Sequence, residues 1–256
     1  MLQKISDRIW YLEADHHSDR PALGYILGEK RSFAVDAGAS KAHVELFYRE
    51  LEARGLPLPT FTGISHYHWD HSYGTAFLHG ISLASRLCEE ELQKESSWRW
   101  TAEDMRARLQ SREDIPFGYY SKLAEYPDVS AIRVAVPEIA LEGETTFDLG
   151  GVHVQAICCG GPHSDDQMIF FIPEEKFLFL GDASGKELFR LSWDYDPAHP
   201  ERLNDTLAAL PYNRSKLKPF VQRLESLPFT HCLFAHADQV WNREELLHDL
   251  RAHLGK

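Results

Sequence analysis

Three imidazoles and one carboxylate stand within six residues in the stretch His66-Tyr67-His68-Trp69-Asp70-His71. The stretch directly follows residues 61–65, a short and partly β-prone run that predicts a strand. His66 and His68 alternate with Tyr67, so in an extended segment both project to the same side, as two ligands of one ion must. Asp70 and His71 then need a turn to face a second ion. The pattern favours a metal site at a strand end over the alternative, a solvated surface loop.

Upstream of this stretch, the sequence predicts an antiparallel meander followed by a helix. Residues 8–13, 22–28 and 32–36 have the composition of short strands, and polar, turn-rich segments separate them. Apolar and aromatic residues then recur at helical spacing between residues 41 and 54, at Val44, Phe47, Tyr48 and Leu51. Gly55 and Pro57 end this predicted helix.

Downstream, strands and helices continue to interleave. Residues 152–158, 168–172 and 177–180 predict strands. Two C-terminal helices are predicted from apolar spacing, one by Leu217, Phe220, Val221 and Leu224 and one by Leu246, Leu247, Leu250 and Leu254. Asn242 and Glu245 resemble a capping box before the last helix. The alternation favours a layered α/β fold with helices outside the sheets, and 256 residues suit a single domain over residues 1–256.

The segment from about residue 89 to residue 137 fits this alternation least well, because it carries many aromatic residues among many charges. We interpret it as an inserted helical cap, or lid. Its aromatic residues either pack an extra helical pair onto the core or also contact substrate. The candidates for substrate contact are Trp98, Trp100, Tyr119 and Tyr120.

The sequence HYHWDH resembles the H-x-H-x-D-H signature of the metallo-β-lactamase superfamily, which also contains glyoxalase II, lactonases and the tRNA-processing nuclease RNase Z. Four further positions extend the resemblance in order and approximate spacing over nearly the whole chain. Asp36 in AVDAG is similar to the family's early strand-end aspartate, and His163 in GGPHS to its third histidine. Asp182 in FLFLGD is similar to its bridging aspartate, and His236 in FAHAD to its last histidine.

The resemblance implies a four-layer αββα sandwich with two divalent transition-metal ions at one edge. It assigns the first ion to His66, His68 and His163, and the second to Asp70, His71 and His236. Asp182 would bridge the ions, and Asp36 would support the ligand loop without touching a metal. The nitrogen-rich donor set suits zinc best, with iron or manganese as alternatives. A water shared by two cations loses a proton readily, and Asp70 would orient it or relay its proton.

Several residues near these motifs have a possible but weaker connection to the site. His16 and His17 lie in the first predicted hairpin loop, where relatives often carry a mobile flap, although a solvated loop explains them equally well. Lys186 is either an anion anchor or an ordinary surface residue. Asp165 and Asp166 follow His163 where many relatives have a nearby glycine, and they would disfavour anionic substrates if they faced the pocket. The remaining histidines lack ligand spacing and are expected to be structural: His43, His79, His153, His199, His231, His248 and His253.

Composition and charge exclude several classes of partner. Hydrophobic residues make up 43% and charged residues 26%, as in an ordinary globular protein. Lys and Arg total 27 against 39 for Asp and Glu, which opposes binding to nucleic acid or anionic lipid. The first residues, MLQKISDRIW, lack a signal-peptide pattern, and no run approaches the length of a membrane span. We therefore expect a cytoplasmic protein with a small-molecule substrate, and no pattern specifies its oligomeric state.

Three functions compete at this stage. The leading hypothesis is hydrolysis of an ester, lactone, thioester or phosphoester; a β-lactam is a weaker candidate because enzymes acting on those drugs are usually exported. The second is an iron-dependent oxidoreductase, since the superfamily also contains di-iron oxygen reductases and persulfide dioxygenases. Those reductases resemble a pattern with glutamate where this chain has His68, which favours hydrolysis. The third is a non-enzymatic metal-binding or scaffold role.

Overall fold

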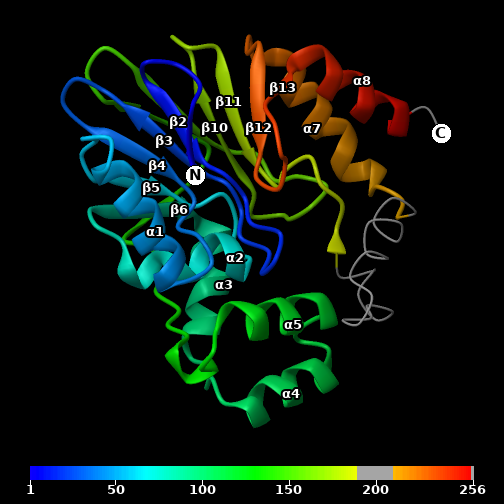
Figure 1. The fold of residues 1–256 in the computed structure, drawn as a ribbon. Helices are drawn as coiled ribbons and strands as arrows, with labels where there is room; N and C mark the ends of the chain where they lie inside the picture. The colour runs from blue at the N-terminus through cyan, green and yellow to red at the C-terminus, as the bar shows by residue number, and fades with distance from the viewer. Residues whose placement is uncertain (189–209, 255–256) are drawn as a thin grey trace.

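Two β-sheets pack face to face and carry helices on their outer sides in this computed structural model, which describes residues 1–188 and 210–254 (Figure 1). His199, one of the histidines expected to be structural, lies outside the described residues. The layered arrangement confirms the predicted αββα sandwich, with a mainly N-terminal sheet and a C-terminal sheet forming the two inner layers.

The first sheet contains seven strands in chain order: β1 (Leu2–Lys4), β2 (Ile9–Leu12), β3 (Leu23–Leu27), β4 (Ser32–Val35), β5 (Phe61–Gly63), β6 (Ile81–Ser85) and β7 (Ile139–Leu141). Strands β1 to β4 pair antiparallel, which confirms the predicted meander, and β4 to β7 pair parallel. Because β4 and β5 are parallel, their carboxyl ends meet at the same edge of the sheet. β5 is two residues shorter than predicted, since the Ser65 amide pairs with the Asp36 carboxylate instead of a strand.

The second sheet contains six strands in the order β13 (Trp241–Asn242), β12 (His231–Phe234), β11 (Phe177–Gly181), β10 (Met168–Ile172), β9 (His153–Cys158) and β8 (Glu144–Asp148). The pairings are antiparallel except that of β11 with β12. The predicted strands at residues 152–158, 168–172 and 177–180 are confirmed as β9, β10 and β11. That parallel pairing brings the carboxyl ends of β11 and β12 together.

The main core lies between the two sheets. Every residue of β10 and β11 is buried, so these central strands have no polar face. Phe33 of the first sheet lies 5.6 Å from Phe170 of the second, measured between ring centroids. Burying such rings contributes much of the stability of a layered domain. This packing holds the strand ends of both sheets at a fixed separation.

Helices cover the outer faces of both sheets. Helix α1 (Lys41–Glu52) buries Phe47 and Leu51 against the first sheet, and Ser40 caps its first turn. Helices α7 (Arg214–Ser226) and α8 (Arg243–Leu254) cover the second sheet (Figure 1). The predicted capping box is confirmed, because the Glu245 amide donates to Asn242 and the Asn242 amide donates to Glu245.

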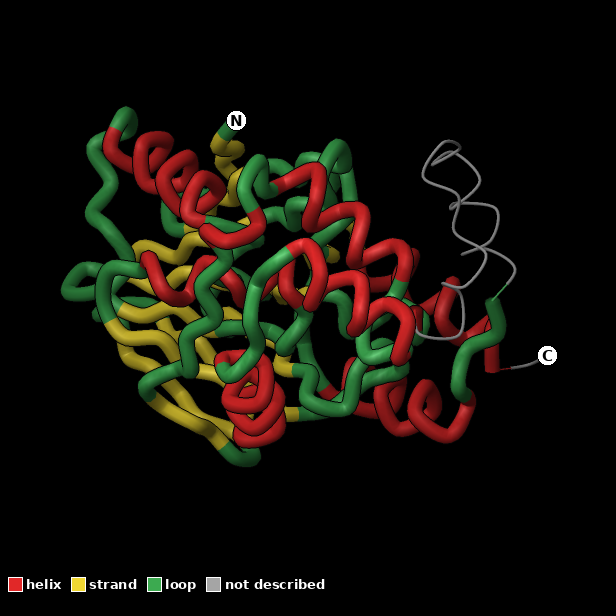
Figure 2. The backbone as a smooth tube through the Cα atoms, turned by 90° about the horizontal axis from the view of Figure 1, so that it is seen from below, coloured by secondary structure: helices red, strands yellow, loops and turns green. Residues whose placement is uncertain are grey.

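The segment expected to form a cap contains three α-helices. Helix α3 (Arg86–Ser96) begins before that segment and belongs to the sandwich, since Cys88 and Leu92 pack with Ile64 and Ala84. Helices α4 (Ala102–Ser111) and α5 (Pro116–Glu125), followed by the short helix η2 (Val129–Ala131), extend beyond the sheets. Seen from below, helices and loops lie in front of many of the strands (Figure 2). Two more short helices, α2 (Trp69–Ser72) and η1 (Tyr73–Phe77), follow β5.

We predict that Gly63→Ala destabilises the fold by about 1–3 kcal/mol, because overpacking of a filled core forces neighbouring side chains to move. A Cβ atom at Gly63 would lie 2.3 Å from the Phe170 ring. Urea unfolding measures the change in the free energy of unfolding. In a Phe170→Leu background the same substitution should cost less, since the ring is gone. An equal cost in both backgrounds would contradict this origin.

Candidate metal centre

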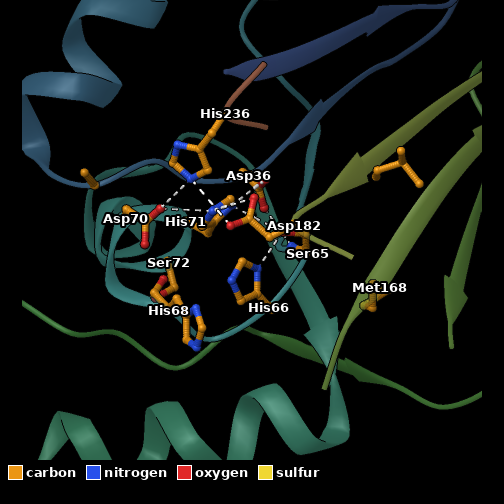
Figure 3. Close-up of polar contacts among 12 residues, drawn as sticks. Asp36, Ser65, His66, His68, Asp70, His71, Ser72, Met168, Asp182 and His236 are labelled. Carbon is orange, nitrogen blue, oxygen red and sulfur yellow. Dashed lines mark hydrogen bonds and ion pairs between the residues drawn. The ribbon is translucent and has the colours of Figure 1, made fainter. Parts of the chain in front are cut away.

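The residues of the predicted site come together from the ends of several strands (Figure 3). His66, His68, Asp70 and His71 follow β5, and the last two lie on helix α2. His163 lies between β9 and β10, whereas Asp182 directly follows β11 and His236 follows β12 by two residues. Because strands of both sheets end at this edge, residues distant in sequence meet in one place.

Three imidazoles form the first ligand group. One ring nitrogen from each of His66, His68 and His163 lies within 4.8 Å of the others. The Nε2 atom of His163 lies 3.0 Å from Nδ1 of His68. This group has the same members as the first metal site that the family resemblance implies.

A second group combines a carboxylate with two imidazoles. The Oδ2 atom of Asp70 lies 3.0 Å from Nε2 of His71 and 3.2 Å from Nε2 of His236. These three atoms can hold one ion. The membership again equals that of the implied second metal site.

Asp182 lies between the two groups (Figure 3). Its Oδ1 atom is 3.6 Å from Nε2 of His71, and its Oδ2 atom is 3.6 Å from Nε2 of His163 and 3.5 Å from Nε2 of His236. Gly181, with φ of +54°, makes the turn that presents this side chain, and a Cβ there would lie 2.5 Å from the Ser65 side chain. One carboxylate therefore faces imidazoles of both groups.

Asp36 and Ser65 orient the imidazoles from behind. Asp36 accepts a hydrogen bond from Nδ1 of His71 at 2.9 Å and another from the Ser65 amide at 2.7 Å. The Ser65 hydroxyl lies 3.0 Å from Nδ1 of His66. The contacts to His71 and His66 both engage Nδ1, so Nε2 of each of these two rings faces the centre. Asp36 has φ of +67°, and its two hydrogen bonds support this uncommon backbone conformation.

The unpaired atoms at the centre fit metal ions. His66 Nε2, His71 Nε2 and Asp182 Oδ1 are buried and make no hydrogen bond to any described residue, although His71 Nε2 lies within ion-pair distance of the Asp70 and Asp182 carboxylates. Buried polar atoms normally have partners, because desolvating them without a partner is costly. Two bound cations would satisfy them, and nitrogen and carboxylate donors are those that divalent transition metals bind. The donor set therefore fits such ions.

The electrostatics of the two groups differ. Burial and neighbouring rings lower the pKa of His66 well below its usual range, and burial lowers that of His68 to about 3. These rings are therefore neutral, with lone pairs available to a metal. On the other side, burial opposes protonation, but nearby carboxylates raise the pKa of His71 well above its usual range and that of His236 to about 9. A metal ion there would replace protons, so its binding should be pH-dependent.

The β2–β3 loop (residues 13–22) contributes a site residue that sequence reasoning missed. Asp19 places Oδ1 3.6 Å from Nδ1 of His236, and burial raises the pKa of this aspartate to about 7. The left-handed backbone conformation of Asp19, with φ of +62°, cannot be recognised from the sequence. His16 and His17 also line the pocket, and Nε2 of His16 lies 2.9 Å from the Asp238 carboxylate.

Lys186, Asp165 and Asp166 near His163 differ in how they relate to the pocket. The Lys186 carbonyl oxygen accepts a hydrogen bond from Nδ1 of His163 at 2.8 Å, so the backbone of this residue orients a ligand ring. The Lys186 side chain lines the pocket and lies over the Tyr212 ring. Asp166 is buried and accepts a hydrogen bond from the Tyr67 amide, whereas Asp165 is exposed and pairs with Lys216. Neither carboxylate belongs to the described lining of the pocket, so the condition under which the two would act on substrate charge is not met.

A pocket of about 810 Å³ opens over the ligands, and helix α5 and its flanking residues form part of its wall. Trp98 lines it, but Trp100, Tyr119 and Tyr120 do not belong to its described lining. Trp100 instead packs on Tyr73, and the Arg108 guanidinium lies 4.6 Å from the ring centroids of both Trp98 and Trp100. Tyr119 is buried and its ring contacts Tyr120. Trp100 and Tyr119 therefore pack within the protein, whereas Tyr120 is exposed to solvent.

The sequence matches the model of the metallo-beta-lactamase superfamily over residues 21–218, and the chain belongs to that superfamily. A metallo-beta-lactamase from Pontibacter korlensis is 16% identical, with a TM-score of 0.64 over 100% of this chain and 99% of that chain. One from Cronobacter sakazakii is 15% identical, with a TM-score of 0.63 over 100% and 95% of the two chains. The DIM-1 metallo-beta-lactamase is 14% identical, with a TM-score of 0.60 over 100% and 96%. These structures share the fold.

A comparison with curated proteins finds no significant match. Among the helices of residues 1–188 and 210–254, none is both long and apolar enough to cross a bilayer.

Glu95 generates a prediction about pH. This buried pocket residue accepts a hydrogen bond from the Tyr73 hydroxyl at 2.8 Å, and burial raises its pKa from 4.5 to about 7. Between these values the folded state keeps a proton that the unfolded state has lost, so stability falls as pH rises. Glu95→Gln removes this titration and should gain stability relative to the unsubstituted protein between about pH 5 and about pH 8.

Denaturant unfolding of chelator-treated protein at both pH values measures this difference. Tyr73→Phe, made in the unsubstituted protein and in Glu95→Gln, tests whether the Tyr73 hydroxyl contributes equally to the free energy of unfolding in both. A difference between Glu95→Gln and the unsubstituted protein that does not change with pH would contradict the assignment.

Proposed function

We propose that the protein is a metal-dependent hydrolase that holds two divalent transition-metal ions, most simply Zn²⁺, and cleaves an acyl bond in a small molecule. The observation that carries this proposal is the convergence of two ligand groups and Asp182 on buried, unpaired atoms at the pocket. The family supports it, because chains with these motifs are commonly metal-dependent hydrolases. A ligand cluster at the wall of a large pocket also suits substrate entry better than a closed structural metal site does.

The chain's own residues have distinct tasks in this proposal. His66, His68 and His163 would hold one ion, and Asp70, His71 and His236 the other, with Asp182 between them. Bound cations would supply an acidified water and polarise the scissile carbonyl. Asp70 would orient the attacking water or relay its proton, since its carboxylate is held between His71 and His236. Asp36 would keep His71 oriented throughout.

The charges of the pocket favour uncharged acyl substrates over phosphoesters. Away from the ligands, the described lining carries five carboxylates and two lysines, at Asp19, Glu95, Glu113, Asp114, Asp238, Lys122 and Lys186. Two divalent ions would bring four positive charges, of which Asp70 and Asp182 offset two. Of these carboxyl groups, burial raises the pKa of Asp19 and of Glu95 to about 7, and Asp114 is paired with Lys122. Glu113 and Asp238 are left as carboxylates in the lining, and they repel an anionic phosphoester more than a neutral ester, lactone or thioester.

We predict about two bound ions per chain after reconstitution with zinc, because the ligands divide into two groups. Elemental analysis of the purified protein measures the ratio. His236→Ala should lower it to about one, whereas His153→Ala, which changes an exposed histidine paired with Glu174, should leave it unchanged. A ratio of one or less at saturating zinc, iron or manganese would exclude the two-ion arrangement. An iron-loaded protein that reduces oxygen would favour the oxidoreductase.

We predict that Asp182→Asn reduces hydrolysis to background while the domain stays folded, since the amide keeps the shape but loses the negative charge between the groups. The assay uses p-nitrophenyl esters, lactones, thioesters and phosphodiesters, and the acyl substrates should be the better ones. Asp165→Asn is the matched control, because Asp165 is exposed in the same loop as His163. Circular dichroism monitors folding. An unfolded Asp182→Asn protein would mean that the site is chiefly structural, and full activity would refute its role.

A further inference from the structure

One buried carboxylate joins two separate walls of the pocket. Glu125 lies at the C-terminal end of α5 and is 7% exposed. It accepts hydrogen bonds from the Ser18 hydroxyl at 2.6 Å, from Nε and Nη2 of Arg20 at 2.8 Å each, and from the Ser40 hydroxyl. All these donors lie outside helices α4 and α5. A carboxylate held by a two-pronged arginine contact and two hydroxyls has strong, directional partners.

Two residues that donate hydrogen bonds to Glu125 lie on either side of an aspartate that faces the candidate metal centre. Ser18 and Arg20 flank Asp19, whose carboxylate faces Nδ1 of His236 at 3.6 Å. Arg20 also pairs through its backbone with Asp15 across the same loop. The loop tip between them presents His16 and His17 to the pocket. The position of Asp19 and of this wall therefore depends on what fixes Ser18 and Arg20.

The same helix forms the facing part of the pocket wall. Phe117, Ser121 and Lys122 of α5 line the pocket, and Lys122 pairs with Asp114 at 2.9 Å. Glu125 is one turn beyond Ser121 on this helix, so a shift of α5 moves the pocket lining and Glu125 together. Helix α5 and the β2–β3 loop thus meet through one side chain.

We propose that Glu125 is a positioning residue that locks α5 to the β2–β3 loop, so that the pocket wall and the aspartate behind His236 form one unit. The lock keeps Asp19 in place against His236 and keeps the pocket at its size. The kinetic part of this inference rests on the proposed hydrolytic function, whereas its structural part does not.

The neighbouring residue supplies a matched control. The Tyr126 hydroxyl donates to the Ala39 carbonyl oxygen at 2.6 Å and is buried, so it also ties the end of α5 to the sandwich. Among the described residues, its hydroxyl forms no hydrogen bond with the β2–β3 loop. Tyr126→Phe therefore removes an attachment of α5 to the sandwich and leaves the hydrogen bonds from Ser18 and Arg20 to Glu125 in place.

Hydrogen–deuterium exchange of the full-length protein tests the lock directly, with and without zinc. Glu125→Gln should accelerate amide exchange both in residues 15–20 and in α5, because one contact holds both segments. Tyr126→Phe should accelerate exchange in α5 alone. If Glu125→Gln does not fold, Arg20→Lys approaches the contact from the loop side and should give the same paired effect, because lysine lacks the arginine fork. Acceleration confined to one segment in both Glu125→Gln and Arg20→Lys would overturn the proposal.

Metal retention and kinetics supply two further readouts. Glu125→Gln should weaken retention of the ion at the His236 group by about 10-fold in a chelator competition, as expected when a supporting residue is lost. Tyr126→Phe should retain both ions. For a large substrate, Glu125→Gln should raise KM more than it lowers kcat. Unchanged retention together with unchanged exchange refutes the lock, whereas the absence of any hydrolysis refutes only the proposed function.

Discussion

The hydrogen bonds that Asp36 makes to His71 and to the Ser65 amide join the first sheet to the ligand loop, and the candidate centre depends on them. A buried imidazole can rotate and can be protonated at either nitrogen, so a ligand ring must be fixed from its far side. Asp36, which follows β4, fixes the His71 ring in this way. The Ser65 hydroxyl fixes the His66 ring through its contact with Nδ1. Because the bonding atoms lie behind the rings, the unpaired Nε2 atoms face inward.

The two sheets determine the separation between the two halves of the candidate metal centre. Asp182 and His236 belong to the second sheet's strand ends, whereas His66 to His71 belong to the first sheet's. The packing between the sheets, which includes Phe33 against Phe170, sets how far apart the two halves lie, and the hydrogen bond from the Met168 amide to the Ser65 carbonyl oxygen joins them beside the site. A change in that core therefore reaches the metal centre through the strands and needs no contact with a ligand.

Local patterns in the sequence were sufficient to predict the strands and helices that have a clear apolar pattern. They were also sufficient to find the candidate ligands that are clustered in the sequence. Residues 168–172 form a strand as the apolar run predicts, and the dense HYHWDH stretch lies at a strand end. Strands β1, β6, β7, β8, β12 and β13 escaped prediction. Of these, β1, β7 and β13 contain only two or three residues, which are too few to show a period. Asp19 and Glu125 escaped for another reason: their roles come from tertiary contacts more than 100 residues apart in sequence, which no local pattern encodes.

The aromatic residues of the inserted segment show why composition alone misleads about a pocket wall. Trp98 and Trp100 differ by two positions, yet one lines the pocket and the other packs on Tyr73, and the Arg108 guanidinium lies against both indoles. The segment's contribution to the pocket comes mostly from α5 and the residues before it, and many of these are small or polar. Under the proposed function, substrate selectivity would come from the walls. In this chain α5 and the β2–β3 loop meet at Glu125, so the shape of the pocket and the placement of Asp19 depend on the same helix.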